Sequence, residues 1–183
     1  MTTQILQYGS PLLRSKSQNV KNGYPVNDDF KVLFKILEEF DGIGLSGVQI
    51  GIMKRMFVID TTNWANENPE IPAIKKAYVN PVILNKSDNL TSFGEGCLSI
   101  PGIHELVDRP ESITVKYKDV MFNTIEEELN GIEARIFQHE YDHLDGILFI
   151  DRLSPLRKVI LEGKIKKIKK NALSMNRNKN KSL

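Results

Sequence analysis

The sequence predicts an α+β fold in which mostly antiparallel β-sheets pack around a central helix, with an amphipathic helix near the N-terminus and a basic helix at the C-terminus. Apolar residues recur at helical spacing in three segments, residues 27–41, 131–144 and 155–168. Segments rich in β-branched and aromatic residues predict four strands, at residues 55–60, 77–84, 113–118 and 125–129. A short turn separates the last two strands, which therefore predict an antiparallel hairpin. A length of 183 residues suits a single domain with a sizeable core.

The composition, 40% hydrophobic and 26% charged, is that of an ordinary globular protein. No run of eighteen or more apolar residues occurs, so we expect no membrane span. Residues 1–6 lack the basic and apolar regions of a secretory signal, which argues against secretion. Cys97 is the single cysteine, so an internal disulfide is excluded and a reducing cytoplasm is the expected location.

The net charge of +2 is unevenly distributed along the chain. Residues 164–183 contain eight of the 25 basic residues and no acidic residue, so the other 17 basic residues oppose all 23 acidic ones, a net charge of −6. This asymmetry indicates an anionic partner for the C-terminal segment, with a solvated terminus as the alternative. We therefore divide the domain into a main part, residues 1–163, and a basic helix or tail, residues 164–183.

The chain begins with an irregular segment, residues 5–20, in which a turn at Gly9 precedes a short helical piece. Asn27 then has the character of a helix N-cap, followed by two aspartates that suit the positive end of a helix dipole. An apolar stripe comes next, made of Phe30, Leu33, Phe34, Leu37 and Phe40. We expect this helix to end near Asp41, with Gly42 as its stop.

Residues 42–51 contain four glycines, which indicates a close backbone approach or positive φ angles. No strand is predicted before this segment and no Lys-Ser/Thr follows it, so it is not expected to hold phosphate. A structural turn is the plain interpretation. Gln49, however, is an amide within a run of apolar and small residues, and it needs a polar partner.

Two polar loops are predicted around the second strand. Residues 61–76 read as a surface loop in which Trp64 makes local packing contacts, and residues 85–94 read as another. The strand between them contains Pro81, so we expect it to be kinked or to lie at a sheet edge. The segment after the second loop, residues 95–102, places Cys97 among glycines and apolar residues, where a thiol could bind a metal or simply pack.

The central helix carries the pattern His139-Glu-x-x-His143, bounded by Asn130 as a cap and by a stop at residues 145–146. Histidines four residues apart lie on one face of a helix and can share one ion, and Glu140 can then move a proton beside it. Apolar residues precede the motif at helical spacing, so the imidazoles are expected to be buried, where a metal would compensate for their desolvation. The alternative is a surface helix that carries these residues without a metal.

A catalytic site of this kind needs a third ligand. The third histidine of the metzincin pattern is absent, because Phe149 occupies its position. A glutamate further along the chain could come only from Glu162, which lies in the basic segment. His104 and Cys97 remain as candidates, and a thiolate with two imidazoles suits a borderline or soft divalent ion.

Three segments in this order, residues 42–49, 95–99 and 138–143, resemble the signature motifs of the peptide deformylase family. The resemblance extends from the N-terminal turn to Pro155, so residues 1–163 would form the catalytic part. One departure is that Ser46 and Gly47 stand where the family usually has two alanines.

The resemblance implies one divalent ion bound by Cys97, His139 and His143, most commonly Fe²⁺, with Zn²⁺, Ni²⁺ or Co²⁺ able to replace it. It implies that Glu140 transfers the proton during hydrolysis. The side-chain amide of Gln49 and the backbone N–H of Leu98 are the expected donors to the developing oxyanion.

The implied substrate is a nascent polypeptide that begins with N-formylmethionine, and formate is released. The peptide is expected to bind as an added strand through the main chain of Ile43, Gly44 and Gly96. We place the methionine pocket among Ile43, Ile136 and His139, with Phe137 as a further candidate.

Two arginines and the basic helix complete these expectations. Arg109 is expected to form a structural ion pair, and Arg135 to lie near the pocket rim without an assigned role. The resemblance implies that the basic helix contacts ribosomal RNA through a group of lysines, Lys164, Lys166, Lys167, Lys169 and Lys170. Neither DNA nor a membrane is an expected partner. The alternatives are a metalloendopeptidase with the same helix motif, and a metal-binding or ribosome-associated protein without catalysis.

Overall fold

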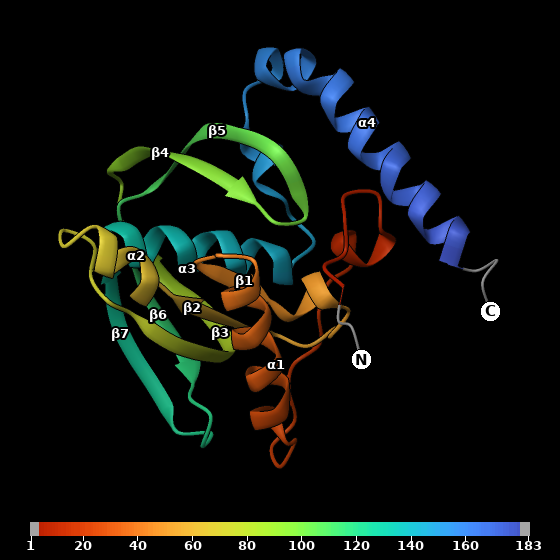
Figure 1. The fold of residues 1–183 in the computed structure, drawn as a ribbon. Coiled ribbons are helices and arrows are strands. Elements are labelled where there is room, and N and C mark those ends of the chain that lie inside the picture. The colour runs from red at the N-terminus through yellow and green to blue at the C-terminus, as the bar shows by residue number, and fades with distance from the viewer. Residues whose placement is uncertain (1–3, 180–183) are drawn as a thin grey trace.

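The computed structural model describes residues 4–179 and confirms the α+β fold (Figure 1). A central helix, α3 (Gly131–Leu144), carries the His-Glu-x-x-His sequence and contacts a larger sheet on one side and a β-hairpin on the other. The strands are β1 (Gly44–Ser46), β2 (Met56–Asp60), β3 (Lys75–Lys86), β4 (Leu90–Cys97), β5 (Ile100–Pro110), β6 (Ser112–Lys118) and β7 (Thr124–Asn130). The other α-helices are α1 (Val26–Glu39), α2 (Thr62–Glu67) and α4 (Pro155–Lys179), and short 3₁₀ turns lie at Pro11–Arg14, Gly47–Ile50 and Phe149–Arg152.

The larger sheet has the order β1-β2-β3-β6-β7 and is antiparallel throughout. Its β6–β7 hairpin confirms the predicted pair of strands and the turn between them. The strand with Pro81 is kinked as expected, because the register of β3 shifts between Val79 and Val82. It is not an edge strand, since β2 and β6 flank it. Asn80 adopts a φ of +48° at this bulge, and its side-chain amide exchanges two hydrogen bonds with the backbone of Val20.

The two-stranded sheet β4–β5 corrects the prediction of a polar loop at residues 85–94. β3 continues through Lys86, and β4 begins at Leu90 and pairs with β5, a strand that the sequence did not indicate. The outer face of this hairpin is exposed to solvent: Leu106 is 70% exposed, and polar residues are frequent. The apolar signal on which strand prediction depends is therefore weak here.

Helix α1 packs its apolar stripe against β1 and β2, but its ends differ from the prediction. It begins at Val26 after Pro25, so Asn27 is inside the helix and is not its cap. The left-handed residue at its end is Asp41, with a φ of +50°, and Gly42 does not take that position. Two further elements replace predicted irregular structure. β1 lies within the glycine-rich segment, and α2 within the loop predicted at residues 61–76.

The central helix is buried because its apolar side chains enter the core beneath the larger sheet. Phe137 is fully buried and lies 5.0 Å, ring to ring, from both Phe57 and Tyr78. Its proposed place in a methionine pocket was therefore wrong. At helical spacing Phe137 faces the sheet, and Ile136 and His139 face the hairpin side, where the cleft lies.

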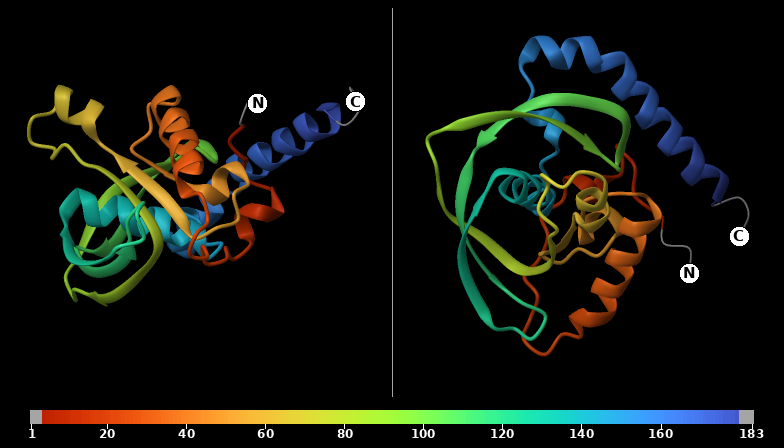
Figure 2. Two further views of the ribbon diagram at one scale, coloured as in Figure 1. Left: turned by 90° about the horizontal axis from the view of Figure 1, so that it is seen from below. Right: turned by 60° about the vertical axis from the view of Figure 1, so that its left-hand side comes forward.

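Helix α4 runs from the outer side of the β4–β5 hairpin towards the N-terminal segment (Figures 1 and 2). It continues without interruption through residues 163 and 164, where the basic segment begins. Leu161 and Ala172 are buried on its inner face, whereas Leu156, Val159 and Ile160 are exposed. Residues 180–183 of the predicted basic tail lie outside the described part of the chain. Within residues 4–179, no helix combines the length and apolar character that crossing a membrane requires.

Candidate metal centre and active site

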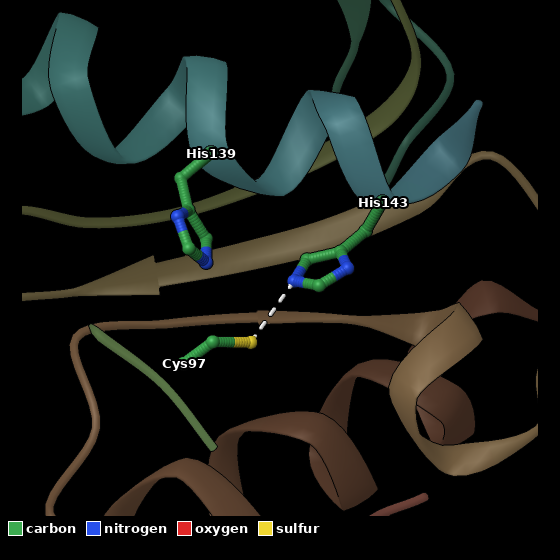
Figure 3. A group of neighbouring side chains, drawn as sticks. All are labelled: Cys97, His139 and His143. Atoms are coloured by element: carbon green, nitrogen blue, oxygen red, sulfur yellow. Dashed lines mark hydrogen bonds between the residues drawn. The ribbon is translucent and has the colours of Figure 1, made fainter. Parts of the chain in front are cut away.

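Cys97, at the end of β4, lies next to His139 and His143 of α3 (Figure 3). One potential ligand atom from each residue lies within 4.8 Å of the others, and the Cys97 Sγ is 3.4 Å from the His143 Nε2. Within residues 4–179 this is the one group of at least three His, Cys, Asp or Glu side chains that could hold a metal. His104 is outside the group and lies opposite Gly96 in the hairpin. Of the two candidates for a third ligand, the structure therefore brings Cys97 to the histidines.

Glu95 orients the first histidine of this group. Its carboxylate lies 2.8 Å from the His139 Nδ1, which leaves the Nε2 of the ring available on the side of Cys97. A carboxylate behind a metal-binding imidazole is a common arrangement that fixes the ring and its tautomer. The sequence contained one signal for it. Glu95 and Cys97 are two residues apart, so in a strand they share a face. That signal was missed because a loop was predicted up to residue 94.

Two buried arginines, Arg109 and Arg135, also contact Glu95. Arg109 is 2% exposed and donates to Glu95 on one side and to Asp142 of α3, at 2.7 Å, on the other, which confirms the predicted structural ion pair. Arg135 lines the cleft, as expected; it is also buried, and donates to Glu95 and to the Thr91 and Val107 carbonyl oxygens. The network joins the hairpin that carries Cys97 to the helix that carries the histidines.

The ligand set fits a divalent ion on three observations. Two imidazoles and a thiol converge, the His143 Nε2 faces the sulfur, and the neighbouring imidazoles favour the thiolate form of Cys97. Burial alone would raise the pKa of the Cys97 thiol, but the neighbouring imidazoles of His143 and His139 lower it to about 5. Such a set suits Fe²⁺, Zn²⁺, Co²⁺ or Ni²⁺ better than a hard cation.

Glu140 lies on the same helix, buried to 3% exposure beside the cluster. Burial raises the pKa of its carboxyl to about 7, although the neighbouring imidazoles oppose the shift. Its Oε2 has no hydrogen-bond partner within residues 4–179. A carboxyl group with such a pKa can both accept and return a proton near neutral pH.

Gln49 is held in place by the backbone of its own turn. The Ser46 N–H donates to the Gln49 Oε1 at 2.8 Å, so the amide nitrogen faces Ser99 Oγ, at 3.3 Å, and the Cys97 sulfur, at 3.6 Å. This meets the expectation of a polar partner. Leu98 directly follows Cys97 and lines the same cleft, and its carbonyl oxygen accepts a hydrogen bond from Gln7.

A cleft of about 520 Å³ opens above these side chains, between β1, the end of β4 and α3. Four of the residues predicted to bind substrate line it, namely Ile43, Gly44, Gly96 and Ile136. Trp64, which the sequence assigned to local packing, lines it as well, and so does His104. The walls are mainly apolar and the polar groups gather at the cluster, as in many sites for small substrates.

Comparison with known proteins identifies the family. The model of the polypeptide deformylase family matches residues 2–159. The chain belongs to this family. A peptide deformylase of Cytophaga hutchinsonii is 38% identical over 93% of this chain and 92% of its own length. A plant peptide deformylase structure superposes with a TM-score of 0.85 at 34% identity and covers 93% of this chain and 91% of its own. A structure from Acinetobacter baumannii, with Met-Ala-Ser bound, gives 0.77 at 30% identity and covers 84% of this chain and 99% of its own.

Family membership settles the class of activity. The chain is a metal-dependent hydrolase that removes the formyl group from the N-terminal methionine of nascent polypeptides, so its substrates are N-formyl peptides. A metalloendopeptidase is not favoured.

Ser46 and Gly47, which stand where the first motif of the family usually has two alanines, fit the packing around them. A Cβ on Gly47 would lie 3.0 Å from the Ile52 carbonyl oxygen and 3.3 Å from the Met56 side chain, so those two residues fill the space that an alanine would need. Ser46 is fully buried and keeps the backbone N–H that orients Gln49.

Proposed function

We propose that Cys97, His139 and His143 hold one catalytic divalent ion, Fe²⁺ first of all, with Zn²⁺, Ni²⁺ or Co²⁺ as substitutes. The observation that carries the proposal is the convergence of one sulfur and two imidazoles within 4.8 Å, at the base of a cleft. When bound, the ion supplies Lewis acidity that lowers the pKa of water towards 7. The soft donor set supports a transition metal rather than Mg²⁺ or Ca²⁺.

Glu140 is proposed as the acid and base of the reaction. Its unpartnered Oε2 can accept the proton of the attacking water, and the same carboxyl can deliver it to the leaving amine. The Gln49 amide, fixed by Ser46, and the Leu98 N–H would donate to the formyl oxygen as it gains negative charge. Preorganised donors of this kind contribute roughly 3–4 kcal/mol each to transition-state binding.

The peptide is proposed to bind as an extra strand against Ile43, Gly44 and Gly96, which all line the cleft. Main-chain pairing does not read side chains, so one site can serve many nascent chains. The methionine side chain would enter the apolar region beside Ile43, Ile136 and His139. The Met-Ala-Ser complex of the Acinetobacter relative supports a peptide of this kind.

The decisive experiment measures formate released from formyl-Met-Ala-Ser by anaerobically purified protein of known metal content. Wild-type protein should turn over, and Glu140→Ala should keep its metal and lose at least about 10²-fold in kcat. Metal-loaded wild-type protein that releases no formate would refute the proposed function. Metal analysis of the same sample identifies the ion.

The C-terminal helix is proposed to contact ribosomal RNA, in the cytoplasm where nascent chains appear. Its basic side chains project from an exposed surface of α4, and this group is Lys164, Lys166, Lys167, Lys169 and Lys170. Changing Lys164, Lys166, Lys167 and Lys170 to Gln should weaken co-sedimentation with ribosomes and reduce its salt dependence, while activity on formyl-Met-Ala-Ser is kept. Unchanged co-sedimentation would contradict this role.

A further inference from the structure

A second hollow of about 380 Å³ lies between the N-terminal segment, the start of β5 and the inner face of α4. Its walls include Ile5, Gln7, Phe40, Pro101, Ile168 and Asn171. Three of these residues, Gln7, Phe40 and Pro101, also line the active-site cleft. The two hollows therefore adjoin at these three residues, and we call the second one the α4 groove.

The walls of the α4 groove are fixed by contacts with the catalytic loops. The Leu6 N–H donates to the Gln49 carbonyl oxygen at 2.7 Å, and the Tyr8 N–H donates to that of Ser99 at 2.8 Å. On the other side, Ala172 of α4 is 8% exposed, and Lys169 packs so closely on Gly9 that an added Cβ would lie 2.9 Å away. These contacts tie both walls of the groove to the body of the protein.

The α4 groove lies where a peptide bound in the active-site cleft would continue. A peptide that pairs with Ile43 and Gly44 runs beside the chain segment 40–44, so one of its ends lies at the metal cluster and the other approaches Phe40. Phe40 is the C-cap residue that follows α1, and it is 47% exposed, so its ring offers apolar surface at this point. Phe40 also lines the α4 groove, so a peptide that reaches Phe40 is next to that groove.

The chemistry of the groove suits an extended polypeptide. Phe40, Pro101 and Ile168 offer apolar surface, and the amide of Asn171, on an exposed position of α4, can both donate to and accept from a main chain. Gln7 donates to the Leu98 carbonyl oxygen and so links the groove wall to the residue beside Cys97. Apolar surface with amides, and no ionised side chain among the groove residues, favours a site that does not select by charge.

We propose that the α4 groove binds the downstream residues of the substrate, as a continuation of the peptide bound in the active-site cleft. The inference rests on the proposed function of that cleft. Helix α4 then has a role in catalytic efficiency on long substrates that is separate from any contact of its lysines with RNA. One or two main-chain hydrogen bonds of ordinary strength correspond to roughly two- to tenfold in kcat/KM.

The test compares formyl-Met-Ala-Ser with the same peptide extended by five neutral residues, using metal-loaded full-length protein. Wild-type protein should show a kcat/KM about two- to tenfold higher for the long peptide. Asn171→Trp, a bulky change at an exposed groove position, should abolish this advantage. The matched control is Val159→Trp, which is 70% exposed on the same helix outside the groove and should retain the wild-type ratio.

Equal kcat/KM for both peptides in wild-type protein would overturn the groove and leave the proposed function intact. A wild-type ratio in Asn171→Trp would also overturn it, because the advantage would then arise elsewhere in the cleft. Failure of wild-type protein to release formate from either peptide would instead refute the proposed function itself. Thermal unfolding of both tryptophan variants at the wild-type temperature shows that the comparison is made on folded protein.

Discussion

The carboxylate of Glu95 lies 2.8 Å from the His139 Nδ1, and through this contact the strand that carries Cys97 also orients a histidine of α3. The same carboxylate accepts from Arg109 at 2.6 Å and from Arg135 at 3.0 Å. Burial alone would raise the pKa of Glu95, but Arg109 and His139 hold it well below its usual range. Glu95 is therefore an ionised acceptor that joins the two elements of the metal centre.

Glu95→Gln should lower both metal affinity and stability. The neutral amide leaves Arg109 and Arg135 buried without their full counter-charge, which costs about 3–5 kcal/mol when one partner of a buried pair is removed. Loss of the partner behind a metal-binding histidine should weaken metal binding about 10–100-fold. Urea unfolding and metal titration measure the two effects.

The control is Glu126→Gln, at an exposed pair with Lys116, which should cost less than about 1 kcal/mol and leave metal binding unchanged. Equal behaviour of the two variants would contradict the role of Glu95.

Gln49→Met should reduce kcat by about 10²–10³-fold with little change in KM, because the amide donors act on charge that develops only in the transition state. Methionine keeps most of the volume but leaves the buried Ser46 N–H without its acceptor. A modest loss of stability, about 1–3 kcal/mol, should accompany the loss of activity. Steady-state kinetics on formyl-Met-Ala-Ser separate kcat from KM. A rise in KM with an unchanged kcat would instead assign Gln49 to ground-state binding.

Much of the fold was predictable where a pattern is local. The apolar stripe of α1, the β6–β7 hairpin and the His139-Glu-x-x-His143 helix all depend on residues within a few positions of one another. The β4–β5 hairpin was not predictable in this way. Its strands are stabilised by pairing with each other and by packing one face on α3, and their outer face carries polar residues.

In the candidate site, too, local contacts could be predicted from the sequence and long-range contacts could not. The two histidines are spaced by one helical turn, so their proximity follows from the sequence, whereas Cys97 is 46 residues from His143 and only the resemblance placed it there. The contacts of Arg109 and Arg135 with Glu95 also join residues that are far apart in sequence, by 14 and 40 positions. Phe137 was misplaced because helical spacing shows that a residue is buried but not which of two packed layers it enters.

Asp60 should contribute stability that depends on pH. Burial raises the pKa of its carboxyl, but hydrogen bonds from Lys75 and Thr62 outweigh burial and hold the pKa below its usual value. Because the folded pKa is the lower one, the contribution is present above the unfolded pKa of about 3.9 and is lost as the pH falls through the folded value. The difference in urea midpoint between wild type and Asp60→Asn should therefore narrow from about pH 6 to about pH 3. A constant difference would exclude this ionisation as the cause.

Gly44→Ala should impair catalysis through a direct clash. An added Cβ would lie 2.6 Å from the Glu140 Oε1 and 2.7 Å from the Ile136 Cγ2, so the carboxyl group must move. Displacement of a catalytic group by about 1 Å can cost about 10²-fold in rate. The matched control is Gly163→Ala in α4, where nothing lies within 4 Å of the new atom and where alanine should stabilise the helix by about 0.5–1 kcal/mol. Full activity in Gly44→Ala would show that Glu140 tolerates the shift.

Removal of the metal should lower the unfolding temperature, because an ion that binds only the folded protein stabilises it by about 2.7 kcal/mol at a hundredfold excess over Kd. Chelated protein should recover the wild-type unfolding temperature when Zn²⁺, Ni²⁺ or Co²⁺ is added.

Two variants identify the third ligand. Cys97→Ala should lose most of this recovery, since two imidazoles alone bind more weakly. His104→Ala should keep it, because His104 is outside the cluster although it lines the cleft. Unfolding temperature reports binding without any assay of turnover, so the experiment discriminates directly between the two ligands that sequence spacing left open. If added metal restored the unfolding temperature of Cys97→Ala but not that of His104→Ala, the third ligand would be His104 and not Cys97.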